Sequence, residues 1–402
     1  MTKRAFVGLA LALSVLGGLL TGAVAGSAHA FTDRAAGDES LRRQDAAPTK
    51  TFVWEEYGLT FTLPEDWQVL GQSQNFDLAL VSPDALVSGE GAFIMLQVYP
   101  TLGQDTTMDS ALDPVAEQVG GEVVPFSAAG LDGFEIAFDD ETSGTTNQLV
   151  LLPYGEKGAV LFIRTSAKPE ENAIVQGILA SMLVDPPAPD YAAIDAAWQT
   201  SVAEQGRLIY GDSDAPVSAI EFFSFTCGHC ASFSMPIEHL IALEADTGRM
   251  RIEIAPIAGD VLAIRATEAT FCAAEQGKGY SAYKVLWDGY LTLGYEKAYS
   301  EEGVQSLLEP LGVDLTALTA CMDADTYNEA LTAIRTDFLD YGLSGTPTVL
   351  LGADGDAPET IKLSDGRVWS GVVPIDTLRA LIRLIIDDGL SVSEATSAYF
   401  GG

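Results

Sequence analysis

The sequence predicts two folded domains of different classes, an α+β, sandwich-like domain in residues 51–184 and an α/β domain in residues 191–402. Three observations support this. The length of 402 residues is enough for two or more domains of ordinary size. Residues 185–190 are rich in proline and form a stiff break. Before the break, short alternating stretches dominate, whereas strands alternate with longer helical patterns after it.

The composition excludes two classes of protein. An apolar content of 48% with 19% charged residues excludes a wholly disordered chain. The net charge of −36, from 57 acids and 21 bases, argues against nucleic acid as a partner, because there is no surplus of Lys and Arg to contact phosphates. The acids occur in both domains, which is typical of a solvated surface. An acidic face for a basic partner and a salty habitat are the alternatives.

Residues 1–30 have the layout of a secretory signal peptide. A short positive region precedes the apolar run 5–25, and Ala28 and Ala30 occupy the −3 and −1 positions of a cleavage site. We expect an exported protein, whose segment is either cleaved or left as a membrane tether. Disulfides persist in such compartments. Residues 31–50 have no apolar period, and we expect a flexible leader there.

Residues 51–184 show the alternation that is typical of strands. Strands are predicted over 51–54, 59–63, 93–99, 134–138, 148–153 and 159–165. Helical spacing predicts helices over 108–119 and 170–182. The segment YGLTFTLPEDW, residues 57–67, resembles the opening of PsbP-like α+β domains. Because the domain contains no Cys or His, we expect a binding or positioning module.

Residues 191–402 alternate between the two patterns. Strands are predicted over 207–210, 217–225, 250–257, 348–351 and 367–369. Helices are predicted over 227–244, 261–276, 280–290, 301–308, 325–341 and 374–386.

All four cysteines lie in this second domain, and Cys227 and Cys230 stand where a buried strand gives way to a helix. Unpaired N–H groups and the positive dipole end at a helix N-terminus stabilise a thiolate, so its pKa falls below the free value of about 8.5. His229, between the two cysteines, can add a positive charge or a donor. A stabilised thiolate favours the dithiol, which makes the disulfide an oxidant of other thiols.

Other roles for this CxxC motif fit less well. Haem attachment needs His directly after the second Cys, where Ala231 stands. A zinc site needs further ligands, and the exported chain offers only His229 and His239 besides the cysteines. A structural disulfide is the remaining alternative, which the strand-to-helix position disfavours. His239 lies off the sulfur face of the helix, and we expect a surface or core residue.

The segment EFFSFTCGHC, residues 221–230, resembles the active-site segment of DsbA-type thiol-disulfide oxidoreductases of the thioredoxin superfamily. The segment GTPT, residues 345–348, resembles the cis-proline loop of that family. The order of the predicted elements also fits, across residues 190–390. The resemblance implies a thioredoxin fold with an inserted helical subdomain. The chain departs from the family at Gly228, where the best-known oxidases carry the more rigid Pro.

The resemblance implies a role for each matching residue. Cys227 would be the exposed sulfur that substrates attack, and Cys230 would be its buried resolving partner. Pro347, in cis, would place the backbone of Thr346 against the disulfide and the substrate strand. Glu221 would be a buried acid, whose raised pKa allows it to pass protons to or from the resolving thiol.

Cys272 and Cys321 lie 49 residues apart in the predicted helical subdomain. Each alone is typical of a small buried hydrophobic residue. Export favours a bond between them, and some relatives bridge helices of this insertion, so we expect a second, structural disulfide.

The sequence therefore predicts an exported, periplasmic or extracellular, thiol-disulfide oxidoreductase that oxidises protein thiols through Cys227 and Cys230. We expect no metal, nucleotide or flavin cofactor. The expected partners are exported proteins with free thiols and a redox partner that resets the pair, with the membrane only if the N-terminal segment stays uncleaved. A disulfide reductase or isomerase is one alternative. A redox-inert binding or chaperone module on a thioredoxin scaffold is the other.

Overall fold

The computed structural model describes residues 48–400, apart from gaps at 71–76, 89–90, 100–101, 103–105, 141–144, 156–157, 167–170, 354 and 364–365. The predicted signal peptide and residues 31–47 of the predicted leader lie outside the described residues. The first strand begins at Thr49, two residues before the predicted end of the leader. The chain divides into two compact units between Pro186 and Pro187.

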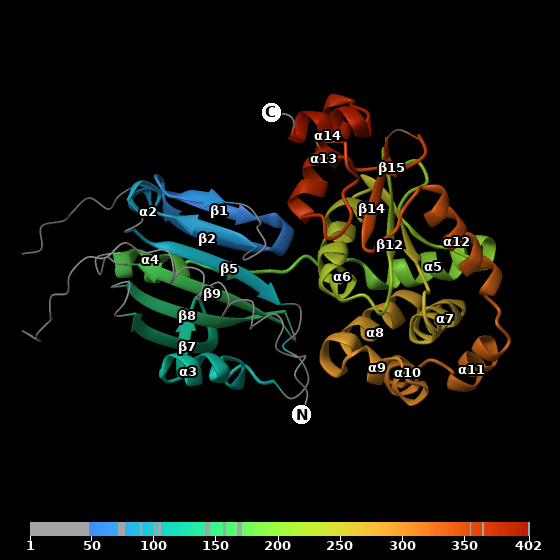
Figure 1. Cartoon of the computed structure of the whole chain (residues 1–402), viewed down its shortest axis with the longest axis horizontal. Coiled ribbons are helices and arrows are strands. Elements are labelled where there is room, and N and C mark those ends of the chain that lie inside the picture. Colours follow the sequence, from blue (N-terminus) through green and yellow to red (C-terminus); the bar gives the residue numbers. More distant parts are fainter. Residues whose placement is uncertain are drawn as a thin grey trace, which may run out of the picture. The chain divides into compact units, whose positions relative to one another are not determined.

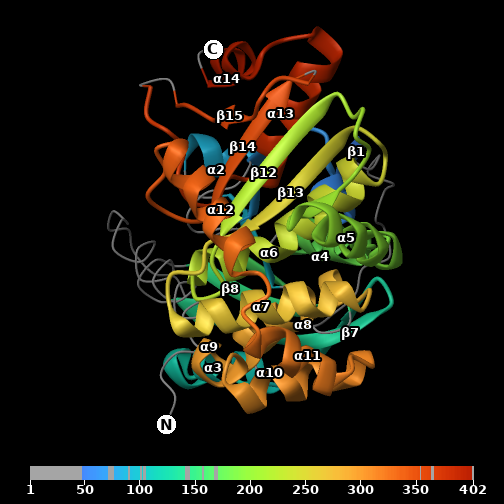
Figure 2. The same ribbon diagram turned by 90° about the vertical axis from the view of Figure 1, so that its right-hand side faces the viewer.

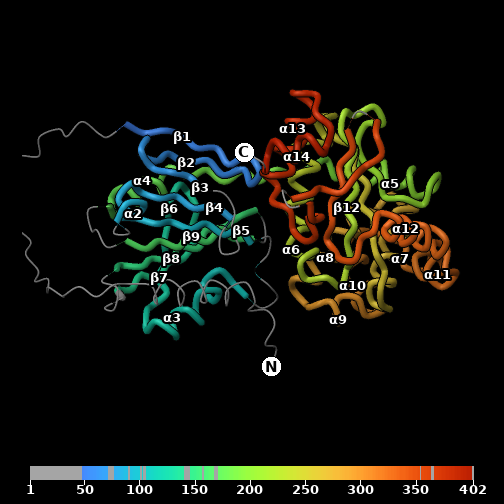
Figure 3. The backbone as a smooth tube through the Cα atoms, turned by 45° about the horizontal axis from the view of Figure 1, so that its top comes forward, coloured from blue at the N-terminus to red at the C-terminus, as the bar shows by residue number. Residues whose placement is uncertain are grey.

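The N-terminal unit is built on a seven-stranded sheet of order β3-β4-β5-β9-β8-β7-β6, in which every neighbouring pair is antiparallel (Figures 1 and 3). Its strands are β3 (Gln68–Leu70), β4 (Leu78–Val81), β5 (Phe93–Tyr99), β6 (Val124–Ala128), β7 (Leu131–Asp140), β8 (Thr145–Tyr154) and β9 (Gly158–Ser166). A three-stranded sheet contains β1 (Thr49–Trp54), β2 (Leu59–Pro64) and β10 (Leu183–Val184). The helices are α2 (Pro83–Val87), α3 (Asp113–Val119) and α4 (Asn172–Ala180).

One face of the seven-stranded sheet forms the core of this unit. Ile136, Leu149 and Leu161, from three neighbouring strands, pack with Leu112 and Val115, which lie in and just before α3. All five are buried. Burial of each such side chain stabilises the fold by about 1.5–3 kcal/mol. The alternation that predicts these strands therefore reflects a real sheet face that helix α3 covers.

All six predicted strands of this unit are present, most of them longer than predicted. The predicted helix 108–119 is shorter than expected: a 3-10 turn, Ser110–Leu112, precedes α3, which has Pro114 in its first turn. The sequence pattern does not predict β3, β4, β6 or β10. These strands have two to five residues, which is too short for a period to emerge.

The C-terminal unit contains a five-stranded sheet of order β11-β13-β12-β14-β15 (Figures 1 and 2). Its strands are β11 (Leu208–Tyr210), β12 (Val217–Phe223), β13 (Met250–Pro256), β14 (Thr348–Ala353) and β15 (Glu359–Thr360). Strands β12 and β13 are parallel, and the other pairs are antiparallel. The chain leaves β12 through the active-site helix α6 (Gly228–Leu240) and returns in β13. This is the strand–helix–strand unit that the sequence predicts.

The helices of this unit fall into two groups. Those outside the long insertion are α5 (Tyr191–Gln205), α6, α13 (Ile375–Asp388) and α14 (Val392–Phe400). Those inserted between β13 and β14 are α7 (Val261–Glu275), α8 (Gly279–Leu293), α9 (Tyr295–Ala298), α10 (Glu301–Leu308), α11 (Leu315–Asp323) and α12 (Asn328–Asp340). The helical subdomain expected from the resemblance is therefore present.

Two predictions for this unit need correction. Residues 367–369 do not form a strand: Val368 makes only an isolated bridge to Lys362, and β14 pairs instead with β15. A pairing of two residues depends on the register of β14, which local sequence does not encode. Helix α5 is also missing from the prediction, although Asp190 caps it by accepting a hydrogen bond from Ala193 N–H at 3.0 Å.

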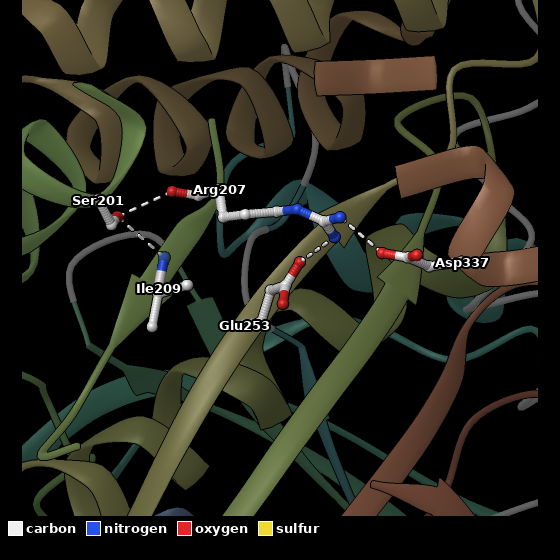
Figure 4. Close-up of polar contacts among 5 residues, drawn as sticks. All are labelled: Ser201, Arg207, Ile209, Glu253 and Asp337. Carbon is white, nitrogen blue, oxygen red and sulfur yellow. Dashed lines mark hydrogen bonds and ion pairs between the residues drawn. The ribbon is translucent and has the colours of Figure 1, made fainter. Parts of the chain in front are cut away.

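An ion-pair network fixes the insertion to the edge of the sheet (Figure 4). Arg207, just before β11, contacts Glu253 of β13 at 2.8 Å and Asp337 of α12 at 2.5 Å. The Ser201 hydroxyl of α5 donates to the Arg207 carbonyl oxygen at 2.8 Å and accepts from Ile209 N–H at 3.2 Å. The last helix of the insertion is thus tied to the sheet that carries the active-site strand.

Candidate active site

Cys227 is the N-cap residue of α6, in an extended conformation after β12. Its N–H donates to the Ser224 carbonyl oxygen at 3.0 Å, and its own carbonyl accepts from Ala231 N–H at 3.1 Å. The intervening turn keeps the side chain half-buried at the start of the helix. The first N–H groups of α6 have no partner within the helix and are available to its sulfur.

The pKa of Cys227 is lowered to about 5. The largest cause is a hydrogen bond from the Cys230 side chain; partial burial opposes it. The backbone N–H groups of Cys230 and His229 and the side chain of Thr346 lower the pKa further. At neutral pH the reduced protein therefore carries a thiolate at Cys227, as the helix N-terminus predicts.

Cys230 has the opposite character. It is 1% exposed, and burial is the main reason that its pKa lies far above the ordinary value of a thiol. The nearby Cys227 sulfur raises it further. In the dithiol form Cys230 thus stays protonated and donates to the thiolate. The pair combines one accessible nucleophile with one buried, protonated partner.

The peptide bond between Thr346 and Pro347 is cis. Strand β14 begins at the next residue, and Thr348 pairs with Phe222 of β12. This register brings the proline loop beside the cysteine turn, so that the Cys227 thiol lies 3.3 Å from the Thr346 carbonyl oxygen. Pro347 itself is anchored through its carbonyl oxygen, which accepts from Gly371 N–H at 2.9 Å.

Glu221 lies in the middle of β12, between Ile254 of β13 and Val349 of β14. It is 1% exposed, and its Oε2 atom has no hydrogen-bond partner among the described residues. Burial raises its pKa to about 8. At neutral pH the carboxyl group therefore holds a proton in the core below the cysteine pair.

The two histidines differ from each other in environment. His229 is exposed, and the group through which it acts on the Cys227 sulfur is its backbone N–H. The predicted charge or donor of its imidazole is therefore not what lowers the pKa of Cys227. His239 is 3% exposed and belongs to the core of α6.

Cys272 of α7 and Cys321 of α11 form a disulfide with a Cα–Cα distance of 5.9 Å. It joins two helices of the insertion and leaves only the Cys227–Cys230 pair as free thiols. Closing a loop of 49 residues stabilises the fold by about 4 kcal/mol on a chain-entropy model.

Sequence reasoning missed three residues of this region. The Asp260 carboxylate caps α7 and accepts a hydrogen bond from the Thr226 hydroxyl, next to Cys227, at 2.7 Å. Its position as an N-cap was the only signal. Tyr283 of α8 is buried near Glu221, whose charge follows burial as a cause of its raised pKa. Tyr290, also of α8, lies against Gly228. Neither tyrosine has a motif.

Comparisons with known proteins agree with this architecture. Residues 203–360 match the protein-family model described as Thioredoxin. No curated protein matches the chain. Three similar solved structures come from Wolbachia pipientis, Silicibacter pomeroyi DSS-3 and Proteus mirabilis. The first, alpha-DsbA1, has a TM-score of 0.39 and 17% identity, covering 48% of this chain and 95% of its own.

The second, a thioredoxin-like oxidoreductase, has a TM-score of 0.34 and 18% identity, covering 46% of this chain and 92% of its own. The third, the catalytic domain of ScsC, has a TM-score of 0.34 and 16% identity, covering 50% and 97%. The sheet order, the helical insertion and the family match together confirm the predicted fold. The C-terminal unit is a thioredoxin-like domain, of a kind that supports thiol-disulfide oxidoreductase activity.

Proposed function

We propose that the protein is an exported thiol-disulfide oxidoreductase that oxidises substrate thiols through a Cys227–Cys230 disulfide. The observation that carries this proposal is the contrast between the two thiols. Cys227 is half-buried with a pKa of about 5, and Cys230 is buried with a pKa raised far above the ordinary value. Such a pair has one sulfur that substrates reach and one that leaves and returns inside the protein.

The proposed reaction starts from the oxidised pair. A substrate thiolate attacks the Cys227 sulfur, a mixed disulfide forms, and the bond to Cys230 breaks. The departing Cys230 sulfur takes a proton, for which the protonated Glu221 carboxyl is the proposed source. A second substrate thiolate then attacks the substrate sulfur and releases Cys227 as a thiolate. Two electrons pass from substrate to protein, and a redox partner must remove them.

The direction of the reaction follows from the stability of the Cys227 thiolate. Whatever stabilises the thiolate stabilises the reduced protein and makes its disulfide more oxidising. Hydrogen bonds from Cys230, His229 and Thr346 all act in that direction. We therefore favour an oxidase over a reductase or isomerase. The reactive pair also argues against a redox-inert binding or chaperone module.

Export, to the periplasm or the outside of the cell, rests on the sequence of residues 1–30. Among the described residues, no helix has the length and apolar character needed to cross a membrane. A tether, if one exists, would have to be the N-terminal segment. For the N-terminal unit we propose a binding or positioning role, and its resemblance to PsbP-like domains stays a prediction.

Refolding of a reduced, disulfide-containing test protein tests the proposal. The oxidised protein should speed the regain of native disulfides, and Cys227→Ser should abolish the effect. Reduction of insulin by dithiothreitol, followed in parallel, measures the reductase alternative. If Cys227→Ser leaves both activities at the level of the unaltered protein, the oxidoreductase proposal is wrong.

A further inference from the structure

Gly228 follows the reactive cysteine and is the first residue of α6. A Cβ atom built on it would lie 3.3 Å from the hydroxyl oxygen of Tyr290. That distance is tighter than an ordinary van der Waals contact. The helical insertion, through α8, therefore reaches the backbone of the active-site turn at its least hindered residue.

Aromatic neighbours hold Tyr290 in this position. Its ring lies 5.8 Å from that of Trp287, 5.9 Å from that of Tyr295, which it stacks on, and 6.3 Å from that of Tyr299. Trp287 and Tyr299 are buried, whereas Tyr290 and Tyr295 are half-buried. The Tyr290 ring is thus supported by the core of the insertion while its hydroxyl extends to Gly228.

The same aromatic cluster is joined to the turn from the other side. Phe225, two residues before Cys227, lies 4.9 Å from Trp287 and 5.6 Å from Tyr299 between ring centroids. The turn is therefore held on the insertion at Phe225 and again at Gly228. Between these two points stands the reactive sulfur.

We propose that Tyr290 is a positioning residue of the redox site: its contact with Gly228 keeps the N–H groups of His229 and Cys230 directed at the Cys227 sulfur. This inference rests on the proposed function, because it concerns the same pair of cysteines. Glycine has the greatest backbone freedom of any residue, and Gly228 connects the sulfur to both donors. A group that restricts Gly228 thus preserves the alignment of the donors with the sulfur.

Tyr290 acts through the backbone and not through a bond of its own to the sulfur. The groups that lower the pKa of Cys227 are Cys230, Thr346 and His229, and the Tyr290 hydroxyl is not among them. Proline, as in the best-known oxidases of the resembled family, restricts the backbone covalently. In this chain a tyrosine from the insertion supplies the restriction by contact.

The test compares Tyr290→Phe and Tyr290→Ala with the unaltered protein, and uses Tyr295→Phe as the matched control. Tyr295 belongs to the same cluster but is not the atom group nearest Gly228. The readout is the pKa of Cys227, from thiolate absorbance near 240 nm in the reduced protein. We expect Tyr290→Ala to raise the pKa by about one unit, a tenfold loss of thiolate stability. Tyr290→Phe should raise it less, and the control should leave it unchanged.

A rescue variant separates positioning from general damage. In the Tyr290→Ala background, Gly228→Ala restricts the backbone without meeting a hydroxyl, so the pKa should return towards its original value. If Tyr290→Phe and Tyr290→Ala, both with native circular dichroism, shift the pKa no more than Tyr295→Phe does, the inference is overturned. A failure of the proposed function looks different, because the unaltered protein itself would then lack redox turnover.

Discussion

The Cys227 thiol donates a hydrogen bond to the carbonyl oxygen of Thr346 at 3.3 Å, although 119 residues separate them. Each residue ends a loop beside strands β12 and β14, which pair directly. The carbonyl contact favours the protonated thiol, whereas the Thr346 side chain lowers the pKa of both sulfurs. The net balance favours the thiolate, since the pKa of Cys227 is about 5.

Titration of the reduced protein should show that balance. Absorbance near 240 nm should rise with a midpoint near pH 5, because Cys227 loses its proton there. Cys230 should contribute no second rise below pH 9, since burial keeps its thiol protonated. Cys227→Ser should remove the transition. A single midpoint near pH 8.5, the range of an ordinary thiol, would contradict the assigned environment.

Cys230→Ala should trap substrates on the protein. Without the buried thiol, a mixed disulfide at Cys227 cannot be resolved from within, so adducts should accumulate. Mass spectrometry after incubation with oxidised glutathione should show one added glutathione per chain. Cys227→Ser is the control and should show none. An adduct on the Cys227→Ser variant, or none on Cys230→Ala, would reverse or remove the assignment of the attacking sulfur.

Much of this site was predictable from sequence because its residues are local. The strand, the turn and the helix N-terminus that shape Cys227 lie within residues 217–240, and each element has its own pattern. The proline loop was recognised from four residues of resemblance. Its distance to Cys227, however, depends on the pairing of β12 with β14, a long-range register that local patterns do not contain.

The tyrosines were not predictable for a related reason. Tyr283 and Tyr290 lie on the long helix α8, and tyrosine at helical spacing is typical of any core. Their proximity to Glu221 and Gly228 arises only when the insertion packs on the sheet. The imidazole of His229 shows the converse error: sequence adjacency to the sulfurs predicts contact, but the helical turn exposes the side chain.

Glu221→Gln should change how stability depends on pH. The folded pKa of Glu221, about 8, lies above the ordinary value of 4.5, so the unfolded chain loses this proton first. Stability should therefore fall as pH rises from 4.5 to 8, by up to about 1.4 kcal/mol per pH unit. In the variant this component of the slope should vanish.

Urea unfolding of the oxidised protein at several pH values measures this slope without interference from Cys227, which does not titrate in a disulfide. Glu238→Gln, a half-buried exchange on α6, is a control for loss of a carboxylate. If the two variants keep the same pH dependence as the unaltered protein, Glu221 is ionised in the core or solvated.

Replacing both Cys272 and Cys321 by Ala should destabilise the protein while leaving its redox chemistry intact. The loss should reach about 4 kcal/mol at most on the chain-entropy model. The bond joins α7 to α11 within the insertion, and the sulfurs of the active pair are on α6. Thermal unfolding gives the stability, and refolding of a reduced test protein gives the activity. Loss of activity in a variant that is still folded would show that the second disulfide takes part in exchange.

The reduction potential of the Cys227–Cys230 pair tests the central claim most directly. Equilibration with glutathione redox buffers of the variant that lacks Cys272 and Cys321 leaves this single pair to titrate. The stabilised thiolate predicts a potential at or above that of glutaredoxins, about −230 mV or higher, as an oxidase requires. A potential near −270 mV, about that of thioredoxin, would contradict the account and identify a reductase.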